Sequence, residues 1–331
     1  MQFTYQVVIK GLPEALAKDI GNEIANIIQI IQQSEEALDL RRINRIVVTT
    51  DFAGELASLS SITMSGNPIE HTEEEYANAI ATVLIIPSSK EYEILLIIDA
   101  CTAFQLISDS LDRYNSRAYR NAFHAFHHEL CHVHEANKKL DLFPTQILLH
   151  CYDGKDMFLK PLAGLCCSEY IANYLASWTA TSDWLDTITG SLADAISRTK
   201  HTINEEILSY RSHADIGRIM GQFQRHGGFL VKIAAYTLGY IDGLCVTLPE
   251  LSSVAAEKLS GSYFEPTWNA LHVVLREIRE LYPDGWKDLS IYNNLAEVLD
   301  GYYDRIGLIL STTEDGGMYA KIPFRTETTP S

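Results

Sequence analysis

The sequence predicts an α+β protein in which a small, mostly antiparallel β-sheet packs on one long helix and a predominantly α-helical carboxy-terminal region follows. Three observations predict this class. Most β-rich runs lie in the first hundred residues, helical periodicity dominates from about residue 116 onward, and 47% of the 331 residues are hydrophobic, enough for a sizeable core. A chain of this length favours two domains, which we expect at 1–182 and 183–331.

The first third of the chain carries both strand and helix signals. Residues 3–10 alternate as in a strand, and residues 12–38 repeat apolar side chains with the period of a helix. The runs 45–50, 80–87 and 91–99 are rich in residues that favour strands. The last two flank a short polar turn, which favours an antiparallel hairpin and completes a sheet of about four strands.

Helical patterns fill most of the remaining sequence. We expect helices over about 116–138 and 161–180, followed by several amphipathic helices up to about residue 310. The least regular positions after the second of these helices, 179–183, place the domain boundary. The late run 316–324 is either a strand that returns to the sheet or a tail.

Composition excludes several classes of function. The formal net charge of −17 argues against a broad phosphate-binding surface, because nucleic-acid affinity depends on clustered Lys and Arg. The amino terminus lacks the pattern of a secretory signal, and no segment approaches the roughly 20 apolar residues of a membrane span. We therefore expect a soluble cytoplasmic protein without nucleic-acid or membrane partners. Its six cysteines form no CxxC pair, so we expect reduced thiols, mostly in the core.

The clearest chemical pattern lies in residues 121–139, which contain five histidines and the HExxH motif His128-Glu129-Leu130-Cys131-His132. Two histidines four positions apart on a helix lie about 40° apart around the axis and about 6 Å apart along it, so both rings can reach one ion. Zinc in catalytic sites favours three protein ligands and accepts imidazole nitrogen. Glu129 lies on the flank of this pair, where a general base can reach the water of the ion without ligating the ion.

Two glutamates compete for the place of the third ligand. Glu169 follows His132 by 37 positions (169 − 132), on the predicted helix 161–180, and can approach from a second direction. Glu135 lies one turn after His132 on nearly the same face of the motif helix, where it either ligates the ion or holds a ligand histidine. A ligand set confined to one helix closes a tetrahedron poorly, which favours Glu169.

The other polar candidates have plainer interpretations. His124 lies about 12 Å from His132 along the helix, too far for a shared ion. His127 and His134 point elsewhere around the helix and are expected at the surface or in packing, and Cys131 is expected as a small buried residue. The oxyanion donor that a hydrolase needs stays open among these side chains: Tyr170, His213, His226, Tyr236 and Tyr240.

HExxH followed by a glutamate on the next major helix resembles the gluzincin metallopeptidases. The small sheet, the motif helix and a helix with the pattern ExxAN are most similar to the minimal gluzincins and the ImmA/IrrE-type peptidases, over roughly residues 80–180. The resemblance implies a zincin-like fold with Glu129 as the general base. The zinc ligands that it implies are His128, His132 and Glu169. Many gluzincins carry an aspartate four residues after the glutamate, where Asn173 stands here; its amide oxygen can still accept the ring N–H of a ligand histidine.

This resemblance implies a zinc-dependent peptidase, a hydrolase that acts on a peptide or protein substrate through a water activated by the metal. One strand of the 80–99 hairpin is then the expected shelf for an extended substrate. The alternative is a non-proteolytic zinc-containing regulatory or interaction protein. The intact Glu129 argues against it, because a purely structural site has no use for a base. No sequence feature decides whether the helices after residue 183 cover the cleft or form a dimer surface.

Overall fold

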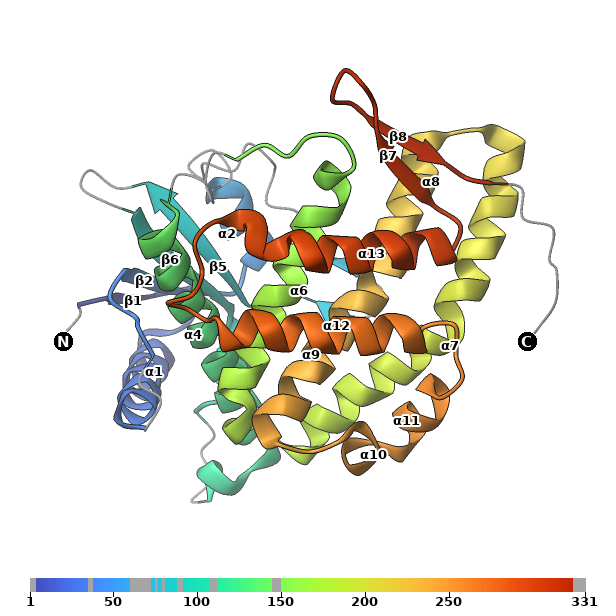
Figure 1. Ribbon diagram of the computed structural model, residues 1–331. Helices are drawn as coiled ribbons and strands as arrows, with labels where there is room; N and C mark the ends of the chain where they lie inside the picture. Colours follow the sequence, from blue (N-terminus) through green and yellow to red (C-terminus); the bar gives the residue numbers. More distant parts are fainter. Residues whose placement is uncertain are drawn as a thin grey trace. The chain divides into compact units, whose positions relative to one another are not determined.

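The computed structural model describes residues 4–34, 38–59, 73–74, 77–78, 81–87, 92–107, 112–144 and 150–323 (Figure 1). The chain has the α+β class that the sequence predicts, and it divides into two compact units. Unit 1 consists of Met1–Leu149 and Ile171–Trp184, and unit 2 of His150–Tyr170 and Leu185–Ser331. The predicted boundary between residues 182 and 183 lies two residues before the last of these junctions, whereas the placement of His150–Tyr170 in unit 2 has no counterpart in the sequence prediction.

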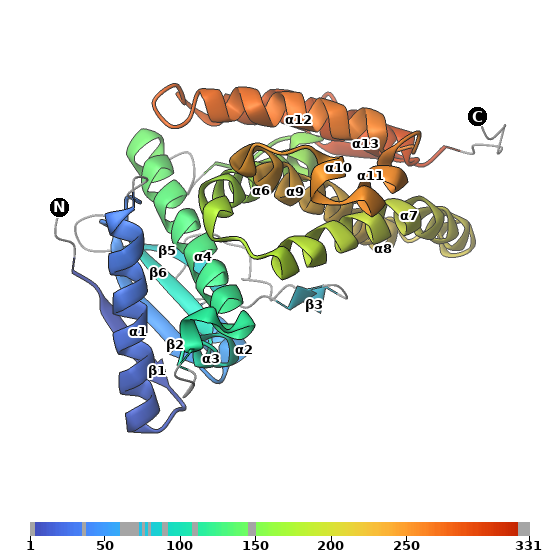
Figure 2. The same ribbon diagram turned by 90° about the horizontal axis from the view of Figure 1, so that it is seen from below.

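The central feature of unit 1 is a four-stranded sheet with the strand order β1-β2-β6-β5 (Figure 2). β1 (Gln6–Lys10), β2 (Ile43–Thr49) and β6 (Tyr92–Asp99) pair in parallel, and β5 (Ala81–Pro87) pairs antiparallel with β6. The predicted antiparallel hairpin over 80–99 is therefore confirmed, although its turn lies outside the described residues. β5 is an edge strand of this sheet, with β6 as its one strand neighbour among the described residues.

The expectation of a mostly antiparallel sheet is wrong, because two of the three pairings in the four-stranded sheet are parallel. β1 continues into α1 (Glu14–Gln33), which carries the chain to β2. A helical crossover of this length brings the next strand back in the same direction, as parallel pairing requires. Between β2 and β5 the chain forms three further elements: α2 (Phe52–Leu59), β3 (Glu73–Glu74) and β4 (Ala77–Asn78). β3 and β4 pair only with each other in the described ranges.

Both faces of the two central strands are buried. Val48 and Leu96 belong to one core cluster together with α1 and α4 (Arg117–Leu142), and Figure 2 shows these two helices beside the strands. Val47 and Ile97 point to the opposite face and pack with α2. Successive side chains of a strand alternate between the two faces, so burial on both sides produces the near-continuous apolar runs seen in the sequence.

The motif helix α4 begins with a defined cap. Ser116 precedes it, and its Oγ accepts a hydrogen bond from the backbone N–H of Tyr119 at 3.1 Å. The buried Tyr119 hydroxyl donates to Glu23 of α1 at 2.8 Å, which ties this end of α4 to α1. The predicted helix over 116–138 is confirmed and continues to Leu142. Two short helical segments precede it: α3 (Ala100–Phe104) and the 3₁₀ helix η1 (Arg113–Asn115).

The next long helix, α6 (Asp156–Ala176), crosses the junction between the units at Tyr170 and Ile171 without a break. It corresponds to the helix predicted over 161–180, but it begins earlier and ends at Ala176, where the 3₁₀ helix η2 (Ser177–Thr179) follows. Ala172 and Ala176 lie in the core cluster of unit 1. The last turns of α6 are thus fixed within unit 1.

Unit 2 is helical apart from one hairpin. Its elements after α6 are the distal part of α7 (Ser182–His213), α8 (Ile216–Gln222), the π-helix η3 (Phe223–Gly228), α9 (Phe229–Leu244), α10 (Leu248–Leu251), α11 (Ser253–Leu259), α12 (Glu265–Glu280), η4 (Leu289–Tyr292), α13 (Asn293–Arg305), β7 (Ile309–Thr312) and β8 (Met318–Lys321). β7 and β8 form their own antiparallel sheet, so the run 316–324 contains a strand that does not return to the four-stranded sheet. Among the helices in the described ranges, none combines the length and apolar character needed to cross a membrane.

The six cysteines are all free thiols. Three are buried (Cys131, Cys166 and Cys167) and three are exposed (Cys101, Cys151 and Cys245). The expectation that most of them lie in the core therefore holds for only half of the set.

Candidate metal centre

His128 and His132 face each other one turn apart on α4. Their Nε2 atoms lie 3.0 Å apart, and the ring planes are perpendicular, at 90°. Leu130 lies about 180° around the helix from the bisector of the two histidines. It is fully buried in the core cluster of unit 1. Because the opposite side of the helix is fixed in this core, both imidazoles are held on the side that faces away from it.

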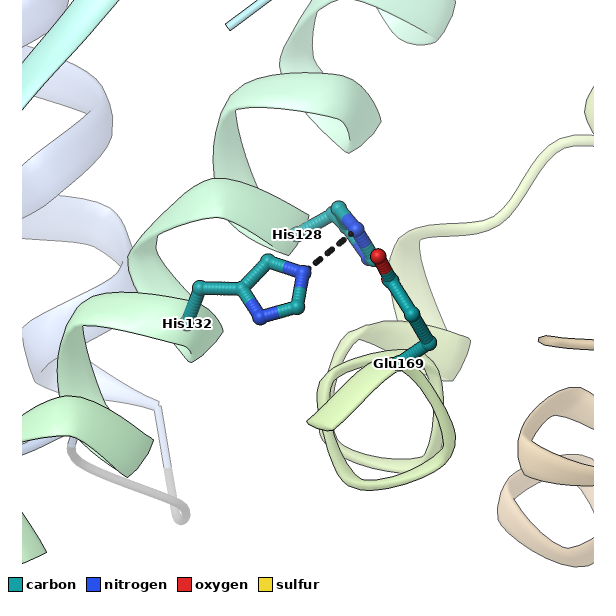
Figure 3. Close-up of side chains that lie close together, drawn as sticks. All are labelled: His128, His132 and Glu169. Atoms are coloured by element: carbon teal, nitrogen blue, oxygen red, sulfur yellow. Dashed lines mark hydrogen bonds between the residues drawn. The ribbon is translucent and has the colours of Figure 1, made fainter. Parts of the chain in front are cut away.

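Glu169 completes a group of three metal-ligating side chains. One ligand atom from each of His128, His132 and Glu169 lies within 4.8 Å of the others. Figure 3 shows the two rings and the carboxylate pointing toward one another. His128 and Glu169 are buried, and His132 is half-buried. The unbroken α6 fixes Glu169 relative to the core of unit 1, since Ala172 follows it by about 4.5 Å along the axis.

This donor set fits a zinc ion. Two nitrogen ligands at about 2.0–2.1 Å from a tetrahedral ion are about 3.3 Å apart, close to the 3.0 Å between the Nε2 atoms of His128 and His132. Two imidazole nitrogens approach this closely only with a proton or a cation between their lone pairs. Two neutral imidazoles and one carboxylate carry a charge of −1 in a largely buried place, which favours a bound cation.

Glu129, the predicted general base, follows His128 on α4 and is half-buried. It borders a small cavity of about 10 Å³, lined mainly by apolar side chains of α1, α3, α4 and β6. The predicted base therefore lies next to a predicted ligand in the sequence and borders the apolar core of unit 1, and its catalytic role stays a prediction.

Glu135, the rival third ligand, has a different partner. Its Oε1 lies 2.7 Å from Nζ of Lys139, one turn later on α4, and the two side chains are 3% and 15% exposed. The close group of ligand atoms found among the described residues contains Glu169 and not Glu135. Glu135 therefore has a cation as its neighbour on α4 and lies outside the close group of ligand atoms.

Two further histidines of α4, His124 and His127, share one hydroxyl. Thr179 Oγ1 donates to the carbonyl oxygen of Ala176 at 2.9 Å, and it lies 2.8 Å from Nδ1 of His124 and 2.9 Å from Nδ1 of His127. Since the hydroxyl proton is used, both rings donate their Nδ1–H to Thr179. Burial and the neighbouring imidazoles lower the pKa of His124 to about 2, and burial and His128 lower the pKa of His127 to about 3. These rings are neutral packing residues, as expected for His127.

His134 and Cys131 also have packing roles. Nδ1 of the half-buried His134 accepts a hydrogen bond from the backbone N–H of Asp39 at 2.6 Å. Burial and the nearby Lys138 ammonium lower the pKa of His134 to about 4. Cys131 is fully buried in the core cluster of unit 1. Both residues match their predicted roles.

Asn173 lies one turn after Glu169 on α6 and is fully buried. Within the described part of the chain, neither its amide oxygen nor its amide nitrogen has a hydrogen-bond partner. The predicted bond from a ligand histidine to its oxygen is therefore not formed. A buried amide without a partner is costly, and such groups call for a functional or structural explanation.

One candidate oxyanion donor is already engaged. The Tyr170 hydroxyl donates to Oδ2 of Asp242 at 2.5 Å, and the side chain is fully buried. Asp242 also accepts from Nε2 of His272 at 3.0 Å. No sequence signal pointed to Asp242, His272 or Thr179, because each acts through a partner far away in the chain. Nδ1 of His213 accepts a hydrogen bond from the backbone N–H of Asp215 at 2.9 Å, and Nε2 of His226 lies 3.2 Å from Oε1 of Gln222. A role as oxyanion donor stays a prediction for these two residues and for Tyr236 and Tyr240.

Comparison of the sequence with models of known families found no matching family, and comparisons with curated proteins and with solved structures found no match. The likeness to gluzincins therefore rests on the motif residues alone.

Proposed function

We propose that the chain is a zinc-dependent peptidase. The observation that supports this most directly is the meeting of the HExxH histidines, His128 and His132, with the buried carboxylate of Glu169, all with ligand atoms within 4.8 Å of one another. Two imidazoles and one carboxylate, with a further glutamate beside the first histidine, form the donor set of a catalytic rather than a structural zinc site.

The protein side chains divide the chemistry among them. His128, His132 and Glu169 would hold the ion, which would lower the pKa of a water and polarise a carbonyl group. Glu129 takes a proton from the attacking water and later delivers it to the amine that leaves. Burial of His128 and Glu169 excludes bulk water, which strengthens each of these electrostatic interactions.

The edge strand β5 supports a peptide as the substrate. α4 packs against both β5 and β6, so the motif helix lies beside this edge of the sheet. An extended peptide can add to an exposed strand through backbone hydrogen bonds, with alternate side chains directed to each face. We therefore expect the main chain of the substrate to run parallel to the edge of the sheet and alongside the motif helix.

The test combines metal content with one conservative substitution. Protein purified without chelators is expected to contain one zinc per chain by inductively coupled plasma mass spectrometry. Glu129→Gln keeps nearly the same volume and leaves all three ligands in place, so zinc content stays the same. Cleavage of a denatured-protein substrate is expected to fall by about 10²–10⁴-fold, the usual contribution of a general base.

A matched control is Glu14→Gln, which removes an exposed carboxylate of α1 in the same unit. It is expected to leave zinc content and cleavage unchanged. Zinc bound by a protein whose Glu129→Gln variant cleaves as fast as the parent contradicts the peptidase mechanism. Zinc bound without any cleavage by the parent points instead to the regulatory alternative, and absence of zinc rejects both.

A further inference from the structure

A second cavity, of about 360 Å³, lies at the amino end of α4, next to the segment that joins η2 to α7. We call it the amino-end pocket. Its lining includes these residues, all within unit 1: Arg117, Arg120, Phe123, Trp178, Thr181 and Asp183. Small-molecule sites in proteins have volumes from about 300 Å³ upward, so the pocket has room for one amino-acid side chain or a compact ligand.

The pocket carries a positive charge that no carboxylate balances. Arg117 is paired, with its Nε 2.7 Å from Oδ2 of Asp183. Arg120 is exposed, and in the described part of the chain no acidic side chain pairs with its guanidinium. A guanidinium presents five N–H donors in a planar fork that matches a carboxylate.

The indole of Trp178 lines the same pocket as Arg120 and forms an aromatic wall. Trp178 is 49% exposed, and its ring lies 4.9 Å from the ring of His127. The next residue, Thr179, is fixed by its bonds to His124 and His127, so the wall is attached to α4 through two neutral, buried imidazoles. A fixed indole next to an unpaired guanidinium suits a ligand that combines an apolar stem with a carboxylate.

The pocket and the two histidines of the candidate metal centre lie along the same helix, α4. Arg120 and His128 are eight positions apart, about 12 Å along the helix axis. An extended peptide advances about 3.3 Å per residue, so the axial separation alone corresponds to three or four residues of an extended substrate. The structure provides a continuous helix between the two places, with His124 and His127 in the interval.

We propose that the amino-end pocket is a specificity site that binds a carboxylate of the peptide substrate through Arg120, with the apolar part of the same residue against Trp178. This inference rests on the proposed peptidase function. The carboxylate has two possible sources, an acidic side chain three or four residues from the cleaved bond, or the free carboxyl terminus of a short peptide. Both present the same planar group to the guanidinium.

The experiment measures binding to the Glu129→Gln protein, so that hydrolysis is not required. One series of carboxy-amidated peptides moves a single Glu along an otherwise neutral extended sequence, and a second series carries Gln in its place. A third peptide keeps Gln and has a free carboxyl terminus. By titration calorimetry, Glu at the best position or the free terminus is expected to lower Kd by about tenfold relative to the neutral amide, the effect of one partly solvated charge-assisted bond.

Arg120→Ala in the same background is expected to raise Kd of the favoured acidic peptide to that of its neutral counterpart. Arg218→Ala, which removes an exposed arginine from α8, is the matched control and is expected to keep the full preference. Because Arg120 is exposed, its loss is not expected to unfold the chain, and equal melting temperatures verify this. A high concentration of sodium chloride is expected to reduce the preference of the parent, since salt screens an exposed charge pair.

A preference for internal Glu identifies the side chain as the source of the carboxylate, and a preference for the free terminus identifies the chain end. Equal Kd values for acidic and neutral peptides, no binding of any peptide, or a preference that persists in Arg120→Ala overturns the inference. The experiments distinguish failure of the specificity pocket from failure of the peptidase function. Cleavage without any acidic preference rejects the pocket alone, whereas an Arg120-dependent preference in a protein that cleaves nothing rejects the peptidase alone.

Discussion

Substitution of Glu169 by alanine tests how much α6 contributes to metal binding, because Glu169 is the one proposed ligand on that helix. Structural zinc sites with four ligands have apparent binding free energies of about 10–16 kcal/mol, or about 2.5–4 kcal/mol for each ligand. Each 1.4 kcal/mol changes an equilibrium constant tenfold. Glu169→Ala is therefore expected to raise Kd for zinc by about 10²–10³-fold. His128 and His132 remain in place and keep the residual affinity, since the core contacts of α4 are unchanged.

Competition with a chromophoric chelator at constant pH measures Kd for zinc in the parent and in the variant. The matched control is Glu135→Ala, which also removes a buried glutamate close to the histidines. Glu135 is paired with Lys139 at 2.7 Å, so its loss is expected to change Kd for zinc by less than about tenfold. It is expected to lower the free energy of unfolding instead, because it leaves the largely buried Lys139 ammonium without its partner.

The proposed ligand set is refuted if Glu135→Ala weakens zinc binding more than Glu169→Ala does. If Glu135→Ala loses zinc and Glu169→Ala retains it, the motif helix alone supplies the carboxylate. If both variants bind zinc as tightly as the parent, neither glutamate is a ligand, and the histidines hold the ion together with a different side chain. Urea denaturation of the metal-free proteins shows whether a loss of affinity reflects a missing ligand or a destabilised fold.

Two other predictions concern buried polar groups near this centre. Asn173→Leu is expected to raise the free energy of unfolding of the metal-free protein by about 1–3 kcal/mol in urea denaturation, because it removes a fully buried amide without a partner among the described residues. The same change is expected to weaken zinc binding by about 10–100-fold if the amide supports a ligand in the loaded site, and a lower stability in chelator contradicts the first expectation. His124→Gln tests the pH dependence. The unfolded state takes up a proton below about pH 6.5, whereas burial keeps the native ring neutral down to about pH 2, so His124 makes the native state less stable as pH falls through this window. Between about pH 6.5 and about pH 5 the loss of unfolding free energy due to His124 amounts to about 2 kcal/mol. Urea denaturation with chelator at both pH values is expected to show a loss smaller by that amount in His124→Gln. An equal loss in the variant and the parent rejects this prediction.

Much of the local structure of unit 1 follows from the sequence. The alternation and β-branching of the four runs before residue 100 locate β1, β2, β5 and β6, and the short polar segment between the last two runs predicts their antiparallel pairing. Periodicity also locates α4, since the apolar positions that include Leu130 recur with the period of a helix. The spacing of His128 and His132 within this helix then suffices to bring their rings together, as the 3.0 Å separation shows.

Pairing between distant segments is decided only by the tertiary structure. The sequence contains each strand, but not the parallel neighbours of β2, because strand order depends on where the connecting helices pack and not on residues within the strand. For the same reason the sequence of the run 316–324 suits either the four-stranded sheet or a separate hairpin. Only the pairing of β8 with β7 in the structure distinguishes these two placements.

For the candidate metal centre, the sequence alone determines the two histidines and the adjacent Glu129, because a single helix fixes the distance between residues one turn apart. It leaves Glu169 and Glu135 as alternatives, since both satisfy the chemistry of a third ligand. The tertiary structure distinguishes them, because it brings Glu169 and not Glu135 into the close group with the histidines. Ala172 and Ala176 anchor α6 in the core and hold Glu169 close to the histidines, while Lys139 pairs with Glu135. Backbone geometry governs the spacing of the two histidines within one helix, whereas packing between helices decides whether a carboxylate from another helix lies beside them.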